Sequence, residues 1–355
     1  MQKLFKNEWT TFAGALLASI LTGILTFTHA NAVLTFIISA IALATLATVV
    51  GHATEQLGNY LGPGATGILQ AAVGNLPELF VGFFALQAGL VKVVQSALVG
   101  SILANSLLVL GLAFFFGGRK NGTQKFHSET PRAMVILMVL AVSALVMPTL
   151  AHSLHTPASA HEITLSIAGA VVLLILFFAS ILFSLRSAPM AEAVPLAEQD
   201  EKRWPMARVI SVLAIAGGSA AFVSDWFVIA LEPATATLGI SQAFAGLVLV
   251  AIAGNAVENV VGIRLAIKNK VDYAISIILN SSLQVALALT PILVLLSFFF
   301  TSTVLTLVLP PLLVVSLALT AILSALIVYD GESNWLEGLA LIGLYIMIAV
   351  SFWWG

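Results

Sequence analysis

The chain has 355 residues, of which 60% are hydrophobic and 8% are charged, and its formal net charge is −2. A soluble fold of this length cannot bury so much apolar surface, so the composition excludes an ordinary soluble globular protein. The lack of cysteine excludes disulfides and thiolate chemistry, and no basic patch indicates a nucleic-acid partner.

Long apolar stretches follow one another almost without pause, and each is long enough to cross a bilayer as a helix. We therefore predict an all-α integral membrane protein with eleven transmembrane helices. In chain order they fall at about residues 10–28, 33–58, 64–90, 94–116, 132–150, 161–185, 206–231, 239–265, 272–298, 303–326 and 336–354. The first run, which ends near Ala30-Asn31-Ala32, has a cleaved signal peptide as its alternative, although it is long for one.

Lysine and arginine are distributed unequally between the predicted loops, and basic residues favour the cytoplasmic side of a membrane. With the N-terminus inside, the cytoplasmic segments hold every basic residue except Lys92. We therefore expect a multi-pass protein of the cell (plasma) membrane, with its N-terminus in the cytoplasm and its C-terminus outside.

Two predicted segments between the helices are polar. Residues 117–131 read as a basic cytoplasmic loop, and residues 187–205 carry four acids among three prolines. We expect the second segment to be a solvated acidic linker between two halves of the chain. Its alternative is a regulatory segment that senses a divalent cation at the cytoplasmic mouth.

An internal repeat relates the two halves, because residues 71–107 align with residues 251–287 at a constant offset of 180 without gaps. The shared motif Gly-Asn-x-x-Glu is polar and costly in a bilayer, so its recurrence is not a hydrophobic coincidence. Five helices in each half would invert the second half relative to the first. The predicted parts are an N-terminal segment with the first helix (1–32), a first five-helix repeat (33–186), the linker (187–205) and a second five-helix repeat (206–355). Inverted repeats with broken helices at the midplane are typical of secondary transporters.

The repeated motif predicts a cation site, because it places two glutamates inside predicted membrane spans. The candidate ligands are Glu78 and Glu258, the asparagines Asn75 and Asn255 three residues before them, and Gly74 and Gly254, where a broken helix would free backbone carbonyls. Such hard oxygen ligands suit Ca²⁺. The motifs contain no His, Cys or Met that would favour a softer metal.

Charge balance in a low dielectric predicts the mode of transport. Two facing carboxylates cannot both stay ionised without compensation, and either one Ca²⁺ or two protons would neutralise Glu78 and Glu258. The pair therefore predicts an exchanger in which both glutamates also carry protons. Several Na⁺ ions would satisfy the same electrostatics.

Further polar residues accompany the motifs. Gln95, Ser101, Asn105, Ser281, Ser282 and Gln284 either supply more oxygen ligands or form ordinary interhelical hydrogen bonds. The acids Glu55, Asp225 and Glu232 fall near the ends of predicted spans. We expect them to attract cations to the two entrances, with plain interfacial capping as the alternative.

The stretches Gly74–Leu79 and Gly254–Asn259 resemble the Ca²⁺/H⁺ antiporter (CAX) family of the cation/Ca²⁺ exchanger superfamily, bacterial type. The stretches Val93–Leu103 and Asn280–Gln284 resemble the same family. The resemblance implies eleven spans, two inverted five-helix halves after a first helix, and an acidic segment between them. It also implies alternating access, with Ca²⁺ efflux driven by proton entry and the motif glutamates as shared Ca²⁺ and proton sites.

Three other functions compete with this interpretation. A Na⁺-driven Ca²⁺ exchanger of the same fold is the nearest, followed by a passive cation channel and an intramembrane enzyme. The enzyme is disfavoured because the sequence has no His-Glu-x-x-His and no nucleophile set at membrane depth. We expect no enzymatic activity and no cofactor besides the transported Ca²⁺ and H⁺. The lipid bilayer is the expected surrounding, and the sequence leaves open whether the chain forms a homo-oligomer.

Overall fold

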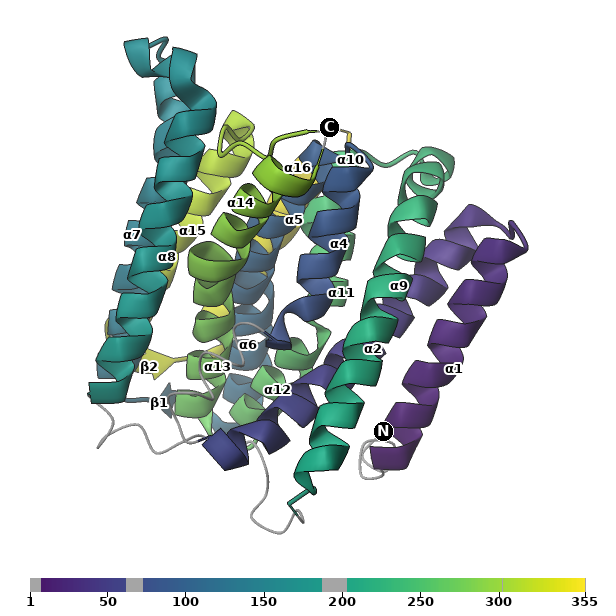
Figure 1. Cartoon of the computed structure of the whole chain (residues 1–355). Helices are drawn as coiled ribbons and strands as arrows, with labels where there is room; N and C mark the ends of the chain where they lie inside the picture. Colours follow the sequence, from purple (N-terminus) through teal and green to yellow (C-terminus); the bar gives the residue numbers. More distant parts are fainter. Residues whose placement is uncertain (1–7, 62–72, 187–202, 302, 355) are drawn as a thin grey trace. The chain divides into compact units, whose positions relative to one another are not determined.

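The structure, a computed structural model, describes residues 8–61, 73–186, 203–301 and 303–354, and these are mostly helical (Figure 1). Within them, seven helices are long and apolar enough to cross a membrane, or eight if one bent pair is a single span. Three shorter apolar helices accompany them, at Leu76–Gln87, Pro311–Ile327 and Trp335–Ser351. The predicted all-α membrane architecture is therefore confirmed. Of the predicted acidic linker, residues 187–202 lie outside the described residues.

The chain divides into two compact units that both draw on the two halves of the sequence. Unit 1 comprises residues 1–88 and 178–239, and unit 2 comprises residues 89–177 and 240–355. Helix α8 (Glu162–Arg186) contributes to both. Each unit is described by itself.

Unit 1 is a small helical bundle. Its other helices are α1 (Glu8–Phe27), α2 (Ala32–Leu61), α4 (Leu76–Gln87) and α9 (Met206–Leu238). Helix α2 packs against α9, where the rings of Phe36 and Phe227 stack with centroids 4.8 Å apart. Just before α9, the buried Trp204 donates its backbone N–H to Gln56 Oε1 at 3.1 Å and accepts a hydrogen bond from the Tyr60 hydroxyl. These bonds anchor the start of α9 to the end of α2.

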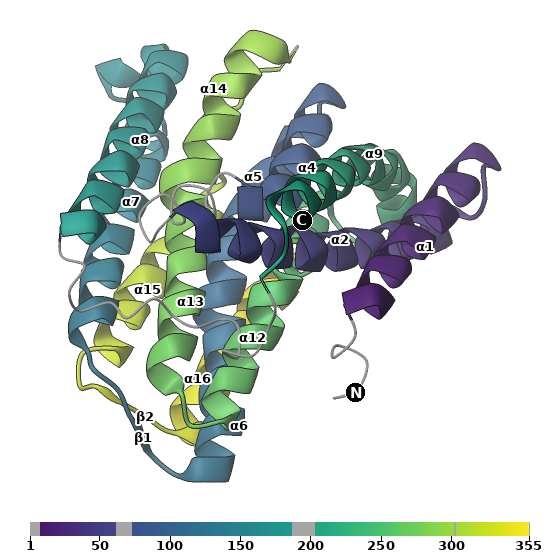
Figure 2. The same cartoon turned by 60° about the horizontal axis from the view of Figure 1, so that its bottom comes forward.

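Unit 2 holds most of the remaining helices. In chain order they are α5 (Val91–Leu103), η2 (Ala104–Val109), α6 (Leu110–Asn121), α7 (Glu129–Ser153), η3 (Pro157–His161), α10 (Gln242–Phe244), η4 (Ala245–Val250), α11 (Ala251–Gly254), α12 (Ala256–Ile267), α13 (Val271–Gln284), η5 (Val285–Leu289), α14 (Thr290–Phe300), α15 (Pro311–Ile327) and α16 (Trp335–Ser351). Strands β1 (Gln124–Lys125) and β2 (Glu332–Ser333) pair antiparallel, and Figure 2 shows them at one end of the unit.

Two long spans of unit 2 contain a wider helical turn at corresponding positions. The span Val91–Asn121 contains the π-helical η2, and the span Val271–Phe300 contains the π-helical η5. Their bounds nearly coincide when the second is shifted back by 180 residues, the offset of the sequence repeat. Short π segments inside helices are frequent at functional sites.

One close helix crossing in unit 2 depends on glycine. Helix α5 crosses η4 so closely that a Cβ atom on Gly100 would lie 2.3 Å from the carbonyl oxygen of Leu247. A Cβ atom on Gly246 would lie 2.4 Å from the carbonyl oxygen of Val93. Both clashes are with backbone, so only glycine permits this approach, as at close helix crossings in membranes generally.

The predicted helix 303–326 is wrong in its first turns. Residues 303–310 are not helical, and α15 begins only at Pro311. Pro310 is extended (φ −52°, ψ 136°) because a residue before proline is disfavoured in the helical region, and Pro311 occupies the first helical position, where proline is tolerated.

Two other predicted boundaries are also wrong. The polar loop 117–131 is shorter than expected, because α6 continues through Arg119 and Lys120, whose charges suit a helix C-terminus, and ends where Gly122 adopts φ +76°. Helix α9 runs past the predicted end at residue 231 to Leu238 with Pro233 inside it. The hydroxyl of Thr235 bonds the carbonyl oxygen of Glu232 in this last part of the helix.

Candidate functional site

The two repeated motifs begin a helix in the same way. Asn75 is the N-cap of α4 with φ −94° and ψ 15°, and Asn255 is the N-cap of α12 with φ −93° and ψ 18°. Their carbonyl oxygens accept the first helical bonds, from Leu79 N–H at 2.9 Å and Asn259 N–H at 3.1 Å. This backbone region is sparsely populated and is found at many active sites.

The predicted break of the second motif helix is confirmed, since α11 ends at Gly254 and α12 begins at Ala256. In the first motif, Gly74 directly precedes Asn75, and α4 begins at Leu76. Residues 62–72, directly before it, lie outside the described part of the chain.

Each motif glutamate is the third residue of its helix. Glu78 lies in the first turn of α4 and is half-buried in unit 1. A carboxylate in this place is favoured by the unpaired N–H groups and the positive end of the helix dipole. Glu258 has the same place in α12 of unit 2, and its side chain lies outside what the structure describes.

Asn255 is the centre of a buried hydrogen-bond network in unit 2. Its Oδ1 accepts from Asn105 Nδ2 at 3.1 Å and from the Ser281 hydroxyl at 3.2 Å. Its Nδ2 donates to Ser101 Oγ at 3.0 Å and to the Ala251 carbonyl oxygen at 2.9 Å. Four of the polar residues singled out in the sequence, from α5, η2, the N-cap of α12 and α13, therefore converge.

Asn105 ties this network together from the π-helical η2. It is fully buried, and its Nδ2 donates to Ser281 Oγ at 2.9 Å as well as to Asn255. These two acceptors fix the orientation of its carboxamide. Its Oδ1 is buried and accepts no hydrogen bond within the described residues, so it is a hard oxygen with acceptor capacity to spare.

A pair of serines lies beside this network, since Ser106 directly follows Asn105 and Ser282 directly follows Ser281 in the sequence. The hydroxyls of Ser106 and Ser282 are 3.1 Å apart, and both residues are buried. Ser282 was named from the sequence, whereas Ser106 was missed. The position of Ser106 directly after Asn105 could have indicated that it belongs to the same polar cluster. Gln284, at the end of α13, is half-buried.

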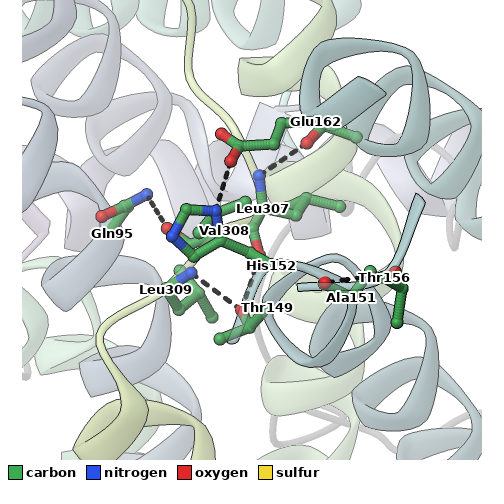
Figure 3. A network of polar contacts seen from close by, with 10 residues as sticks. Gln95, Thr149, Ala151, His152, Thr156, Glu162, Leu307, Val308 and Leu309 are labelled. Carbon is green, nitrogen blue, oxygen red and sulfur yellow. Dashed lines mark hydrogen bonds and ion pairs between the residues drawn. The ribbon is translucent and has the colours of Figure 1, made fainter. Parts of the chain in front are cut away.

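Gln95 does not bond to the Asn255 network. Its Nε2 donates to the carbonyl oxygens of Thr306 and Val308, both at 3.0 Å, in the non-helical segment 303–310. Figure 3 shows Gln95 beside Val308. In the structure Gln95 therefore bonds a non-helical segment that the sequence had assigned to a helix, and its predicted role in supporting the motifs stays a prediction.

Hydroxyl groups satisfy alternate N–H groups of the same segment. Leu305 N–H donates to Ser297 Oγ at 2.8 Å, and Leu307 N–H donates to Ser166 Oγ at 2.9 Å. Leu309 N–H donates to Thr149 Oγ1 at 2.9 Å, as Figure 3 also shows. A partly buried, non-helical stretch of backbone is tolerated here because neighbouring side chains replace the missing helical bonds.

The predicted entrance acids all belong to unit 1. Glu55 is half-buried on α2, Asp225 is half-buried on α9, and Glu232 is exposed. Asp225 is further from the end of its helix than expected, because α9 continues to Leu238.

Among the described residues, no three histidine or acidic side chains gather where they could hold a metal ion. The polar centre of unit 2 instead offers amide and hydroxyl oxygens. Such neutral, hard donors do not suit Zn²⁺ or Cu²⁺ and are compatible with Ca²⁺ once a carboxylate is added.

Comparisons with known proteins agree with this chemistry. The sequence profile of the sodium/calcium exchanger protein family matches two stretches of the chain, residues 31–186 and 208–354. A Ca(2+)/H(+) antiporter of Aphanothece halophytica is 34% identical and covers 98% of this chain and 97% of its own length. The Ca(2+)/H(+) antiporter ChaA of Bacillus subtilis is 35% identical, over 91% of this chain and 93% of its own. The solved structure of native YfkE superposes with a TM-score of 0.81 at 31% identity, over 97% and 99% of the two chains.

Proposed function

This chain belongs to the sodium/calcium exchanger protein family, and from that membership we propose that it is a secondary transporter that exchanges Ca²⁺ for protons across a membrane. Relatives named Ca(2+)/H(+) antiporters match it over nearly its whole length, and this supports the proton as the counter-ion. Ca²⁺ leaves the cytoplasm by alternating access while protons enter.

The observation that carries the proposal is the identical start of α4 and α12. Each helix opens with an asparagine in the same backbone conformation, and each has a glutamate as its third residue. Glu78 and Glu258 are the proposed ligands shared by Ca²⁺ and protons, because either cargo neutralises the same two charges. Ser101, Asn105 and Ser281 line the second motif and supply its polar surroundings.

The orientation of the protein in the membrane is part of the proposal. Asn121, at the basic end of α6, donates to the carbonyl oxygens of Ala266 and Ile267, both at 3.3 Å, near the basic end of α12. Ser241 N–H donates to the carbonyl oxygen of Trp353 at 3.1 Å. The first contact gathers basic loops on one side, and the second places the C-terminal helix beside a loop that has no basic residue. Both support an external C-terminus, opposite the basic loops. The cytoplasmic N-terminus and the cell membrane are proposed with it, from the basic residues Lys3 and Lys6 near the start of the sequence.

We also propose eleven spans, formed by a first helix and two inverted five-helix repeats. The two separate matches of the family profile support the repeat, as do η2 and η5 at corresponding positions. In this proposal α4, α15 and α16 are spans as well, although each is shorter than a typical membrane-crossing helix.

The test is Ca²⁺ flux into liposomes that contain the purified protein, driven by an imposed pH gradient without Na⁺. The wild type is compared with Glu78→Gln, Glu258→Gln and, as a matched control, Glu129→Gln, which removes an exposed acid at the start of α7. We expect proton-driven flux in the wild type and the control, and loss of at least tenfold in both motif variants.

Two results would refute the proposal. Flux that requires Na⁺ and ignores the pH gradient would make the protein a sodium-driven exchanger. Proton-driven flux that survives both glutamine substitutions would show that the motif glutamates do not carry the cargo.

A further inference from the structure

We propose that the side chain of Asn255 is a latch that fixes the broken second motif helix to α5 and α13, and is not itself a cation ligand. Asn105 and Ser101 hold this latch as positioning residues. The statement that Asn255 is not a cation ligand rests on the proposed function. The hydrogen bonds that make Asn255 a latch are a property of the protein without bound Ca²⁺.

The hydrogen-bonding capacity of Asn255 carries the inference. A carboxamide has two N–H donors and two acceptor lone pairs. Asn255 uses both donors, on Ser101 and Ala251, and both lone pairs, on Asn105 and Ser281. The residue is only 2% exposed, so no solvent competes for these bonds. A cation could reach Oδ1 only after two buried hydrogen bonds had broken.

The position of Asn255 explains what the latch does. Asn255 is the single residue between α11 and α12, and its backbone lies in a sparsely populated region. Because this residue belongs to neither helix, contacts from other elements must fix the direction of one helix relative to the other. The hydrogen bonds to Ser101 of α5 and Asn105 of η2 provide such contacts. They therefore fix the direction in which α12, with Glu258 as its third residue, continues after the break.

The sequence does not repeat this latch in the other half. The residue 180 positions after Ser101 is Ser281, which keeps the hydroxyl, but the residue 180 positions after Asn105 is Val285, which has no polar side-chain group. The carboxamide that grips the second motif therefore has no counterpart at the matching position. We infer that α12 is held more firmly than α4 and that Asn105 acts on the second motif alone.

Amide hydrogen exchange of the purified protein in detergent, without Ca²⁺, tests the latch directly. Each lost hydrogen bond of ordinary strength should speed exchange about fivefold in the segment that it holds. We expect Ser101→Ala and Asn105→Ala to raise exchange in residues 256–267, while residues 76–87 keep the wild-type rate. Ser101→Thr, which keeps the hydroxyl, should restore slow exchange. Ser96→Ala is the matched control, since Ser96 is a buried serine of α5 that makes no hydrogen bond to Asn255 among the described residues.

Unchanged exchange in residues 256–267 in both variants would overturn the latch. Equal acceleration in residues 76–87 and 256–267 would overturn the restriction to one motif. If Asn105→Ala does not fold, Ser101→Ala, which removes a single hydroxyl, decides the question alone. This measurement needs no transport, so it stands whether or not the proposed Ca²⁺/H⁺ exchange is found.

Transport kinetics then separate a latch from a ligand. If Asn255 acts through Ser101, the double variant Ser101→Ala/Asn255→Ala should transport Ca²⁺ no more slowly than Asn255→Ala alone, and the preference for Ca²⁺ over Sr²⁺ should stay within about twofold of wild type. Losses that multiply in the double variant, or a preference altered by Asn255→Ala, would identify Asn255 as an independent ligand and refute the proposal.

Discussion

Substituting Gly100 by alanine should separate two helices that touch through their backbones. The new Cβ would lie 2.3 Å from the carbonyl oxygen of Leu247 and 2.5 Å from its Cα, whereas ordinary contacts begin at 3.4 Å. Helix α5 and η4 would have to move apart by about 1 Å, and overpacking of this kind costs about 1–3 kcal/mol. Alanine regains up to about 1 kcal/mol over glycine inside a helix, so we expect a net loss of about 1–2 kcal/mol.

The same displacement should impair transport, because the next residue is Ser101. Its 3.0 Å bond to Asn255 would lengthen towards 4 Å, which is beyond hydrogen-bond range. Thermal unfolding in detergent and proton-driven Ca²⁺ flux in liposomes measure the two effects. Gly343→Ala is the control, since nothing lies within 4 Å of the added Cβ in α16 and the variant should be as stable as wild type or slightly more so. A Gly100→Ala protein with wild-type stability and flux would refute the reasoning.

Three further substitutions separate buried from exposed interactions. Gln95→Leu should lower the free energy of unfolding by about 1–3 kcal/mol in a denaturation assay, because it removes the side-chain donor from two partly buried carbonyl oxygens; a change below about 0.5 kcal/mol would contradict this. Asn334→Ala removes the side chain that caps α16 in a capping box, so its thermal midpoint should drop by the equivalent of about 1 kcal/mol, and an unchanged midpoint would show that the cap is dispensable. Lys125→Ala breaks an exposed ion pair with Glu332 (N–O distance 3.1 Å), and we expect a loss of about 0–1 kcal/mol in the same assay; a larger loss would mean that the β1–β2 contact depends on this pair.

The parts of the site that sequence reasoning found are those with an unusual composition for a membrane. Asn255, Ser101, Asn105 and Ser281 stood out because polar residues inside apolar runs need partners, and the structure brings these four together. The helix break at Gly254 was likewise predicted from the residues themselves. Composition therefore identifies which residues meet, since the cost of burying a lone polar group leaves few alternatives.

The parts that were missed depend on geometry between segments far apart in the chain. Nothing local to Gly100 shows that η4 passes within backbone contact of it. The non-helical segment 303–310 is as apolar as a helix, and its conformation depends on distant donors and acceptors such as Gln95 and Thr149. In the sequence, only the pair Pro310-Pro311 indicates that the helix cannot start before residue 311. The high hydropathy of residues 303–310 favours a helix there, and the prediction followed the hydropathy.

The non-helical segment 303–310 also has a consequence for the synthesis of the chain. Four of the side chains that bond its backbone, Gln95, Thr149, Ser166 and Ser297, precede it in the sequence. During synthesis they are therefore already present when residues 303–310 emerge, and the segment can exchange its water for their hydrogen bonds on arrival. A ribosome stalled only after residues 303–310 have left its exit tunnel should carry this segment protected from protease, whereas a rearranged gene that placed residues 303–327 before α5 would release the same residues before their bonding partners are made.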